Sequence, residues 1–352
     1  MSFDHALTEQ GLLADDVERM RNRLAPLYDG LRGKRLLITG ATGFFGKWLL
    51  AGLAESNRKD NLGLEVIAVS RTPDRFLAQY PAFKSLTGVK YVAADVATFA
   101  QPLPTVDLAI HAATDAATPP GQQKPADVLE TTVTGTRTML SALQKAGVKR
   151  LLTTSSGAVY GRQPSELTHV PETYLGAPDV MDLGSAYGEG KRIAELMGVV
   201  AGRQHGFDFI SARCFAFIGT YLPLDAHFAA GNFIRDAVAG RVILISGDGT
   251  PQRSYLYAGD LVVWLMTMLV RGVAGRAYNV GSDHSVSIEQ LARKIGRDVD
   301  VKTPVDPKRP IARYVPSIDR ARTELGLDVF TPLDDAIARM LATLRSNSNP
   351  SN

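Results

Sequence analysis

Ser156, Tyr187 and Lys191 are residue types that together can move a proton on a hydroxyl group. Tyr187 and Lys191 lie four residues apart in a segment expected to be helical, so their side chains share one face. A tyrosine has an unperturbed pKa near ~10, too high for a base at neutral pH, but a neighbouring ammonium favours its phenolate. Ser156 can hydrogen-bond the same substrate oxygen. The three residues therefore predict a catalytic set in which Tyr187 is the base.

The expected strands and helices must bring these three residues together. Apolar runs typical of strands lie at 35–39, 66–69, 89–93, 108–111, 150–154 and 207–213, and helical segments at 44–56, 128–146 and 185–205. Apolar strands that alternate with helices indicate a parallel sheet covered on both faces. Ser156 follows the fifth strand, at the edge where ligands of such sheets bind. The predicted fold class is α/β, a Rossmann-like doubly wound parallel sheet.

Changes in composition divide the chain into four parts. Residues 1–32 repeat apolar residues at helical spacing, which predicts a helical extension packed on the domain surface or on a partner subunit. Residues 33–217, with returning segments around 254–282, form the expected dinucleotide-binding domain. Longer loops rich in proline and glycine predict a smaller C-terminal substrate-binding cap from 218–253 and 283–345. The polar tail at 346–352 is expected to be disordered.

A glycine-rich turn, GATGFFG, follows the first strand. Its glycines let the backbone turn tightly and approach a pyrophosphate, which the unpaired amides of the following helix would bind. The spacing GxxGxxG is one residue wider than the usual dinucleotide pattern, but its place between a strand and a helix predicts a nicotinamide dinucleotide. The expected contacts are Gly40, Thr42, Gly43, Phe44, Phe45 and Gly46.

The end of the second strand bears on which cofactor, NAD or NADP, is bound. An acidic residue there would bind the ribose 2′-hydroxyl of NAD, whereas this chain has Ser70 and Arg71. Arginine forms bidentate bonds to phosphate oxygens, so Arg71 suits a 2′-phosphate. The cofactor prediction is NAD(P), favouring NADP, and a solvated Arg71 with NAD bound is the alternative.

Seven motifs in order resemble the extended short-chain dehydrogenase/reductase family of nucleotide-sugar epimerases and dehydratases, over residues 34–345. They are the glycine turn, Asp95-Val96, His111-Ala112-Ala113-Thr114, SSGAVYG, YGEGK, Arg253-Ser254-Tyr255 and Tyr278-Asn279-Val280-Gly281-Ser282. The resemblance implies that Ser156, Tyr187 and Lys191 are catalytic, that Lys191 also holds the nicotinamide ribose, and that hydride leaves a sugar carbon. It further implies cofactor contacts from Asp95, Val96, Ala112, Ala113, Thr114 and Phe215, and nucleotide-diphosphate contacts from Asn232, Arg253 and Arg313.

The chain departs from the family pattern at several positions. Thr132 and Ala216 stand where many members have asparagine, so substrate contacts differ there. Sugar 4,6-dehydratases usually carry acidic groups directly after the catalytic Ser or Thr, but this chain has Gly157 and Ala158, which cannot transfer a proton. Dehydration is therefore disfavoured unless Asp115 or His169 substitutes.

These features favour a nucleotide-sugar epimerase, in which the cofactor is reduced and reoxidised in place. The alternative is an NADPH-dependent 4-keto-sugar reductase, for which Arg71 argues slightly, and a 4,6-dehydratase or a decarboxylase is less favoured. A non-catalytic cofactor-binding regulator is disfavoured because Ser156, Tyr187 and Lys191 are intact.

Composition disfavours several other classes of protein. The net charge of +3 is spread without a basic block, which argues against nucleic acid binding. Cys214 is the only cysteine and the six histidines show no HExxH spacing, so disulfides and a metal site are not expected. No apolar run approaches the ~20 residues that cross a membrane, and the acidic N-terminus is unlike a signal peptide. We expect a cytoplasmic protein without a metal and, by analogy with the family, a homodimer.

Overall fold

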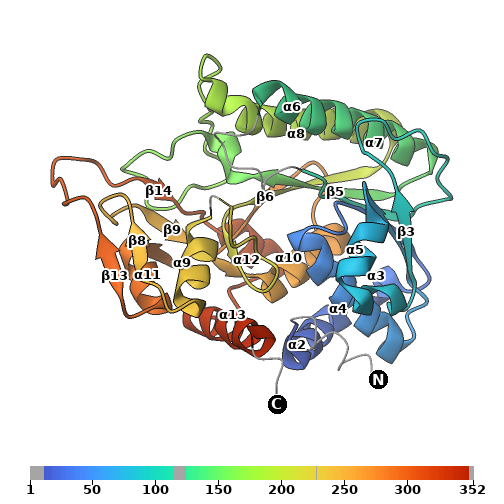
Figure 1. Ribbon diagram of the computed structural model, residues 1–352. Helices are drawn as coiled ribbons and strands as arrows, with labels where there is room; N and C mark the ends of the chain where they lie inside the picture. Colours follow the sequence, from blue (N-terminus) through green and yellow to red (C-terminus); the bar gives the residue numbers. More distant parts are fainter. Residues whose placement is uncertain (1–11, 115–123, 227, 349–352) are drawn as a thin grey trace.

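A seven-stranded parallel sheet forms the centre of the molecule. The computed structural model describes residues 12–114, 124–226 and 228–348 (Figure 1). The order of the strands is β11-β6-β5-β4-β1-β2-β3, and each neighbouring pair is parallel. Their bounds are Arg35–Thr39 (β1), Glu65–Ser70 (β2), Val89–Ala93 (β3), Leu108–His111 (β4), Arg150–Ser156 (β5), Asp208–Cys214 (β6) and Ala277–Val280 (β11). The strand order reverses between β1 and β4, the place where open α/β sheets bind ligands.

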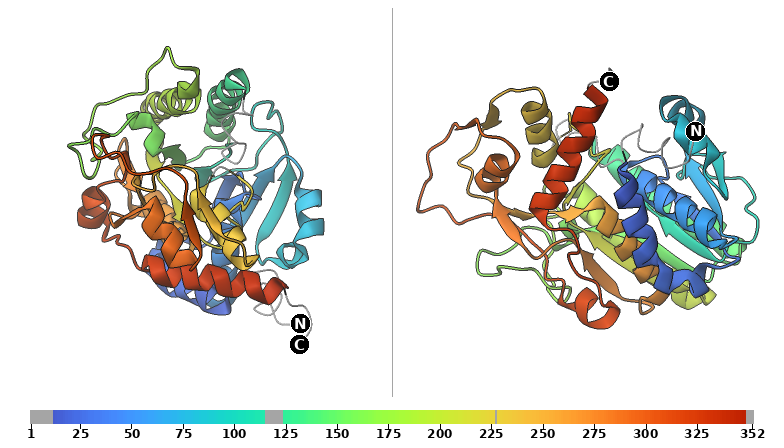
Figure 2. Two further views of the ribbon diagram at one scale, coloured as in Figure 1. Left: turned by 60° about the vertical axis from the view of Figure 1, so that its left-hand side comes forward. Right: turned by 90° about the horizontal axis from the view of Figure 1, so that it is seen from below.

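Helices cover both faces of the sheet, as Figures 1 and 2 show. One face carries α6 (Pro125–Leu129), α7 (Gly135–Lys145) and α8 (Ala186–His205), and the other carries α4 (Phe44–Asp60) and α10 (Ala258–Arg271). In β1 the side chains alternate between two cores: Leu36 and Ile38 pack on the side of α4 and α10, and Leu37 packs on the side of α7. This arrangement confirms the predicted Rossmann-like α/β fold.

The predicted single helix at 128–146 is wrong in one respect. A π-helical turn, Glu130–Thr134, separates α6 from α7. Thr132 lies in this turn, and its side chain packs against Gly190 of α8, where an added Cβ would lie 3.3 Å from the threonine Cβ. The helix thus continues through a wider π-turn where it packs against α8, a feature that periodicity along the sequence did not reveal.

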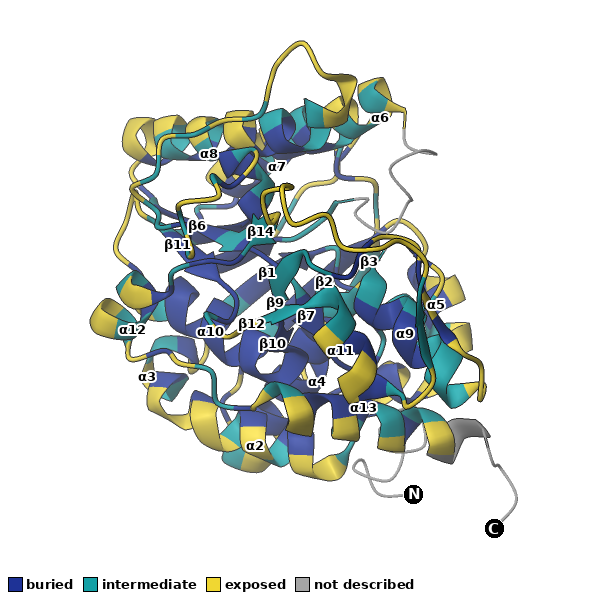
Figure 3. Ribbon diagram, turned by 90° about the vertical axis from the view of Figure 1, so that its left-hand side faces the viewer, coloured by how far each residue is buried: buried dark blue, intermediate teal, exposed yellow. Residues whose placement is uncertain are grey.

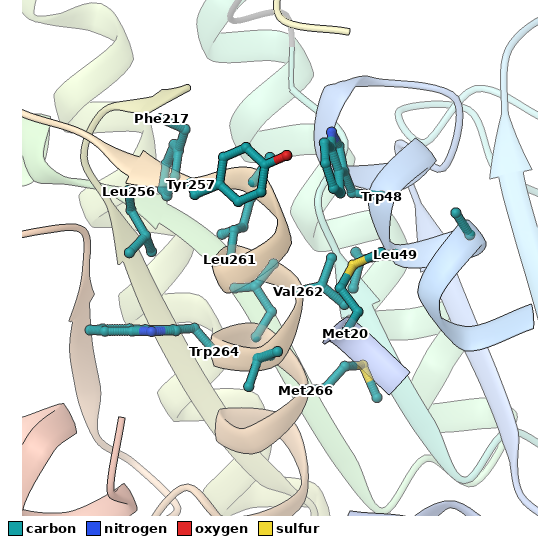
Figure 4. Packing of buried hydrophobic residues seen from close by; sticks show 14 of the residues in the cluster. Met20, Trp48, Leu49, Phe217, Leu256, Tyr257, Leu261, Val262, Trp264 and Met266 are labelled. Carbon is teal, nitrogen blue, oxygen red and sulfur yellow. The ribbon is translucent and has the colours of Figure 1, made fainter. Parts of the chain in front are cut away.

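Residues 12–32 of the N-terminal extension form a third layer on the side of α4 and α10. Its helix α2 (Ala14–Leu24) contacts both of them, and Met20 and Leu24 are fully buried. Figure 4 shows Met20 beside Leu49 of α4 and Val262 of α10. The carboxylate of Asp16 accepts a 2.6 Å hydrogen bond from the Tyr257 hydroxyl. The extension is therefore part of the hydrophobic core and not an appendage.

The C-terminal part carries small sheets and helices beside the carboxyl edge of the main sheet (Figure 1). Its elements are α9 (Ala229–Val238), β8 (Ile243–Ile245), β9 (Gln252–Ser254), β12 (Ser285–Ser287), α11 (Ile288–Ile295), β13 (Val299–Val301), β14 (Arg313–Tyr314) and α13 (Leu333–Ser348). The three-stranded sheet β12-β9-β14 pairs Tyr314 with Arg253. Helix α13 continues to Ser348, so residues 346–348 are helical where a disordered tail was expected, and 349–352 lie outside the described residues.

Candidate active site

Ser156, Tyr187 and Lys191 lie together at the carboxyl edge of the sheet. Ser156 is the last residue of β5, and Tyr187 and Lys191 lie in the first two turns of α8. The Lys191 ammonium is buried, donates a 2.8 Å hydrogen bond to the Thr154 carbonyl and lies 5.8 Å from the centre of the Tyr187 ring. The strand end and the helix start thus hold one hydroxyl, one phenol and one ammonium in a single cluster.

The surroundings of this cluster shift its pKa values. Burial raises the pKa of Tyr187 to about 12, and the hydroxyls of Ser156 and Thr114 oppose the shift because they hydrogen-bond the phenolate. Burial lowers the pKa of Lys191 to about 8, so the side chain still carries its charge at neutral pH. Tyr187 is therefore a proton donor in the ligand-free protein, and more positive charge beside it would turn it into a base.

Position 157 is closed to any side chain. A Cβ on Gly157 would lie 2.7 Å from the Tyr314 hydroxyl oxygen and 2.8 Å from the Phe215 ring. The Tyr314 hydroxyl also lies 3.5 Å from Ser156 Oγ. The glycine that the sequence marks as unable to transfer a proton is thus required by packing. The sequence did not suggest Tyr314, which comes 158 residues after Ser156 in the chain and belongs to none of the seven motifs.

The glycine turn has the shape that a pyrophosphate needs. Gly40 has a φ of +68°, and a Cβ there would lie 2.7 Å from the Ala112 carbonyl oxygen. A Cβ on Gly46 would lie 2.2 Å from the Ala41 carbonyl oxygen. Gly43 is the N-cap of α4 and has no side chain that could cap it. The amides of the α4 N-terminus are therefore not covered by a capping side chain and can donate to an anion.

A buried hub fixes the segment that follows β4. The amides of Ala112 and Ala113 each donate a 3.1 Å hydrogen bond to Thr39 Oγ1, which lies 2.8 Å from His111 Nδ1. Because both lone pairs of the Thr39 hydroxyl are used, its proton goes to Nδ1. The proton of His111 then sits on Nε2 and faces Thr136 Oγ1 at 3.3 Å. Burial lowers the pKa of His111 to about 3, so the ring stays neutral.

The ends of β2 and β3 fit the adenosine half of a dinucleotide. Ser70 ends β2, and its buried hydroxyl has no hydrogen-bond partner within the part of the chain that the structure describes. The next residue, Arg71, is exposed. Asp95, after β3, is also exposed and accepts a 2.8 Å hydrogen bond from the Ala97 amide, while Val96 is buried. The glycine cradle and the unpartnered Ser70 hydroxyl both fit the predicted cofactor.

The residues predicted to bind the substrate diphosphate separate in the structure. Arg253 lies 6.0 Å from the centre of the Tyr314 ring and donates to the Gln252 carbonyl. Arg313 precedes Tyr314 on β14, so the two side chains point to opposite faces, and Arg313 donates to the Ser165 carbonyl at 2.8 Å. Asn232 is half-buried on α9. Arg253 is thus the arginine on the same side of the strand pair as Tyr314.

The acidic groups of α8 are engaged elsewhere. Burial would raise the pKa of Glu195, but the Arg213 guanidinium, which binds both carboxylate oxygens, holds it below its usual range. Glu189 pairs with Arg192 at 3.6 Å.

Two further groups were considered as possible acids or bases. The ring nitrogens of His169 bind Thr168 and the Asp283 carbonyl. Asp115 lies outside the described residues.

Within residues 12–114, 124–226 and 228–348, no group of three His, Cys, Asp or Glu side chains could hold a metal, and no helix is long and apolar enough to cross a membrane.

Comparison with known proteins gives a consistent family. The model of the NAD dependent epimerase/dehydratase family matches residues 36–281. UDP-glucuronic acid decarboxylase 6 of Arabidopsis thaliana is 30% identical over 319 residues, which cover 87% of this chain and 87% of that protein. UDP-glucuronic acid decarboxylase 1 of Xenopus tropicalis is 28% identical over 317 residues, which cover 89% of this chain and 72% of that protein.

Two solved structures show the same fold. A dTDP-glucose 4,6-dehydratase of Streptomyces venezuelae, solved with NAD bound, matches with a TM-score of 0.76 at 24% identity, covering 89% of this chain and 97% of that one. A UDP-glucose 4-epimerase of Thermotoga maritima matches with a TM-score of 0.75 at 21% identity, covering 90% of this chain and 100% of that one.

Proposed function

Because the chain belongs to the NAD-dependent epimerase/dehydratase family, we propose that this enzyme oxidises the C4 hydroxyl of a nucleotide-linked uronic acid and decarboxylates it, with UDP-glucuronic acid as substrate. The observation that carries the proposal is a complete Ser156, Tyr187 and Lys191 cluster beside a Gly157 that cannot carry a carboxylate. The identity to UDP-glucuronic acid decarboxylases over most of both chains supports it and places decarboxylation ahead of the epimerase that the sequence favoured.

The cluster can carry out the first step. When bound, the nicotinamide cofactor supplies a hydride acceptor and later a hydride donor. Tyr187 removes the proton of the C4 hydroxyl, and the positive Lys191 favours the phenolate that this requires. The Ser156 hydroxyl donates to the same sugar oxygen and stabilises the carbonyl as it forms. Arg253 would bind the diphosphate of the substrate, because a guanidinium matches phosphate oxygens.

Oxidation at C4 makes decarboxylation possible without a further base. The substrate carboxylate is attached to C5, so it lies β to the new C4 carbonyl. The bond from C5 to the carboxylate breaks, CO2 leaves, and its electron pair enters the C4 enolate, which then takes a proton at C5. A 4,6-dehydratase instead needs groups that remove a proton and a hydroxyl. The uncharged Gly157 and Ala158 suit decarboxylation, because an acidic side chain there would repel the substrate carboxylate.

The test is product analysis with purified enzyme and UDP-glucuronic acid. We expect release of CO2 and formation of a UDP-pentose, with no net change in nicotinamide. UDP-glucose and UDP-galactose form the comparison set. If the enzyme interconverts UDP-glucose and UDP-galactose and releases no CO2 from UDP-glucuronic acid, it is an epimerase and the proposal is wrong. Net consumption of NADPH would favour the reductase, and a 4-keto-6-deoxy product the dehydratase.

We also propose that the bound dinucleotide is NADP. The support is an exposed Arg71 next to a buried Ser70 hydroxyl without a partner among the described residues, at the end of β2. Replacing Arg71 with alanine should weaken NADP binding by roughly tenfold, the value of about one charge-assisted hydrogen bond, and leave NAD binding unchanged. Titration of protein fluorescence with each nucleotide measures this. Equal losses for both cofactors, or purification with NAD bound, would contradict it.

The outer face of α8 supports a homodimer. Ile193, Leu196 and Val200 are 41%, 65% and 52% exposed, and they lie on one side of the helix. Figure 3 shows exposed segments along the outer side of α8. An apolar stripe of this kind on a helix that carries catalytic residues on its inner side is suited to pairing with a second copy.

A further inference from the structure

Tyr314 reaches the catalytic cluster from the C-terminal cap. It lies on β14, which runs parallel to β9 and pairs Tyr314 with Arg253. Its ring packs on Phe215 with 4.7 Å between ring centres. Its hydroxyl lies 3.5 Å from Ser156 Oγ and 3.5 Å from the Cys214 carbonyl oxygen. The cap therefore places a phenol beside the ends of β5 and β6, within 3.5 Å of Ser156 Oγ.

The hydrogen bonds of Ser156 show what that phenol can do. A serine hydroxyl has one proton to donate and two lone pairs that accept. The Ala158 amide already donates to Ser156 Oγ at 3.1 Å. If Tyr314 fills the second lone pair, the Ser156 proton is left for the Tyr187 hydroxyl, which hydrogen-bonds Ser156, or for a sugar oxygen bound beside it. If Tyr314 instead accepts from Ser156, that proton is withdrawn from the reaction.

Gly157 is an independent sign that the site is built around Tyr314. The space beside its Cα is filled by the Tyr314 hydroxyl and the Phe215 ring, at 2.7 and 2.8 Å from where a Cβ would lie. The Tyr314 hydroxyl thus occupies the place next to Ser156 that a side chain at position 157 would otherwise take. Burial raises the pKa of Tyr314 above its ordinary value, so the phenol keeps its proton. The Tyr314 hydroxyl can share this one proton between the Cys214 carbonyl oxygen and Ser156 Oγ, each 3.5 Å away, because both can accept.

We propose that Tyr314 is a positioning residue, whose hydroxyl donates to Ser156 Oγ and so directs the Ser156 proton to the sugar oxygen. This inference rests on the proposed oxidation of a sugar hydroxyl, and not on the later loss of CO2. It also links the cap to the chemistry, because the strand pair that carries Arg253, the residue proposed for the diphosphate, also carries Tyr314 to Ser156.

The experiment compares hydride transfer in wild type, Tyr314→Phe, Ser156→Ala and the double variant, followed as reduced nicotinamide absorbance in single turnovers. Losing one orienting hydrogen bond should slow hydride transfer roughly fivefold to tenfold in Tyr314→Phe, with KM for the sugar within about twofold. In the Ser156→Ala background the same change should have no further effect, because Tyr314 acts through Ser156.

A matched control comes from the same aromatic cluster. Tyr174 packs beside Tyr160 and Val170, and Tyr174→Phe also removes one phenol oxygen. It should leave hydride transfer unchanged. An unchanged or faster rate in Tyr314→Phe would overturn the inference, and so would an equal loss with and without Ser156, since that outcome indicates a structural role.

A second measurement needs no turnover. In cofactor-bound enzyme with 13Cζ-labelled tyrosine, the Tyr187 signal is assigned by its absence in Tyr187→Phe. Tyr314→Phe should raise the titration midpoint of Tyr187, because a disordered Ser156 proton stabilises the phenolate less. An unchanged midpoint contradicts the inference. UDP-glucose and UDP-glucuronic acid are both used as kinetic substrates. If the enzyme reduces its cofactor but releases no CO2, the decarboxylase proposal fails while the inference about Tyr314 still stands to be tested by the rates of hydride transfer.

Discussion

At the scale of single residues, the candidate active site is set by the burial of two ionisable side chains, Lys191 and Tyr187, away from water. Lys191 is held by the Thr154 carbonyl in a buried position, and Tyr187 lies beside it with a raised pKa. Each shift opposes the charged form that the reaction needs. A positive nicotinamide ring beside Tyr187 would favour its phenolate, and anionic substrate groups near Lys191 would favour its ammonium, so the proton transfer is tied to the bound state.

The role of Tyr187 can be tested by removing one oxygen atom. Tyr187→Phe should lower turnover by roughly a thousandfold, as expected for loss of a general base. Cofactor affinity should change little, because the ring and its packing remain. Turnover assays and nucleotide titration measure the two effects. A variant that keeps more than about a tenth of wild-type activity would show that another group is the base.

Lys191 predicts a dependence of stability on pH. Its pKa falls from 10.5 in the unfolded chain to about 8 in the folded protein. Between these values the unfolded chain binds the extra proton, so folding stability rises with pH across this window. Lys191→Met should therefore stabilise the protein by about 3 kcal/mol at pH 7 and by about 2 kcal/mol at pH 9, while abolishing turnover. Thermal unfolding at both pH values checks this, and an equal gain at both would contradict the sign.

At the scale of elements, a side chain joins the ends of two neighbouring strands, β1 and β4, beyond the point where their backbone hydrogen bonds stop. Thr39 ends β1 and binds the segment after β4 through two amides and His111. These are the two central strands where the sheet order reverses. The hub therefore holds the ends of β1 and β4, the walls of the crevice expected to bind the cofactor, at a fixed separation.

Thr39→Val tests this hub, since it keeps the shape of the side chain and removes the hydroxyl. Two amides and a histidine nitrogen then lose their partner, which should cost about 1–3 kcal/mol of stability and weaken cofactor binding about tenfold. Thr39→Ser keeps the hydroxyl and is the control. Unfolding curves and nucleotide titration give the two quantities. If valine and serine variants bind the cofactor equally well, the hub is not what shapes the crevice.

At the scale of the whole molecule, the N-terminal helix and the C-terminal helix are tied into one body. Arg339 of α13 donates to Asp16 of α2 at 2.8 Å, and Tyr257, at the start of α10, donates to the other oxygen of the same carboxylate. Helices α2 and α13 thus meet on the face of the sheet opposite α8. That leaves α8 on the free side, available to pair with another copy.

The apolar stripe on α8 gives a test of the proposed homodimer. Leu196→Arg puts a charge at the centre of the stripe, where burial without a partner is costly. We expect the variant to be monomeric by light scattering where the wild type is dimeric, with an unchanged thermal midpoint at low concentration. Lys294→Ala, on the distant α11, is the control. A wild type that is monomeric at all concentrations would refute the dimer.

The sequence by itself determined the α/β fold class, the expected strands with bounds within about two residues of those observed, and the spacing that places Tyr187 and Lys191 on one helix face. These features are local, because periodicity, glycine turns and four-residue spacing act over a few neighbouring residues. Tertiary structure alone decided that Tyr314 rather than Arg313 faces Ser156, that Gly157 must be a glycine, and that α2 completes the core. These depend on contacts between residues far apart in the chain, which strand register and packing create and which no local pattern encodes.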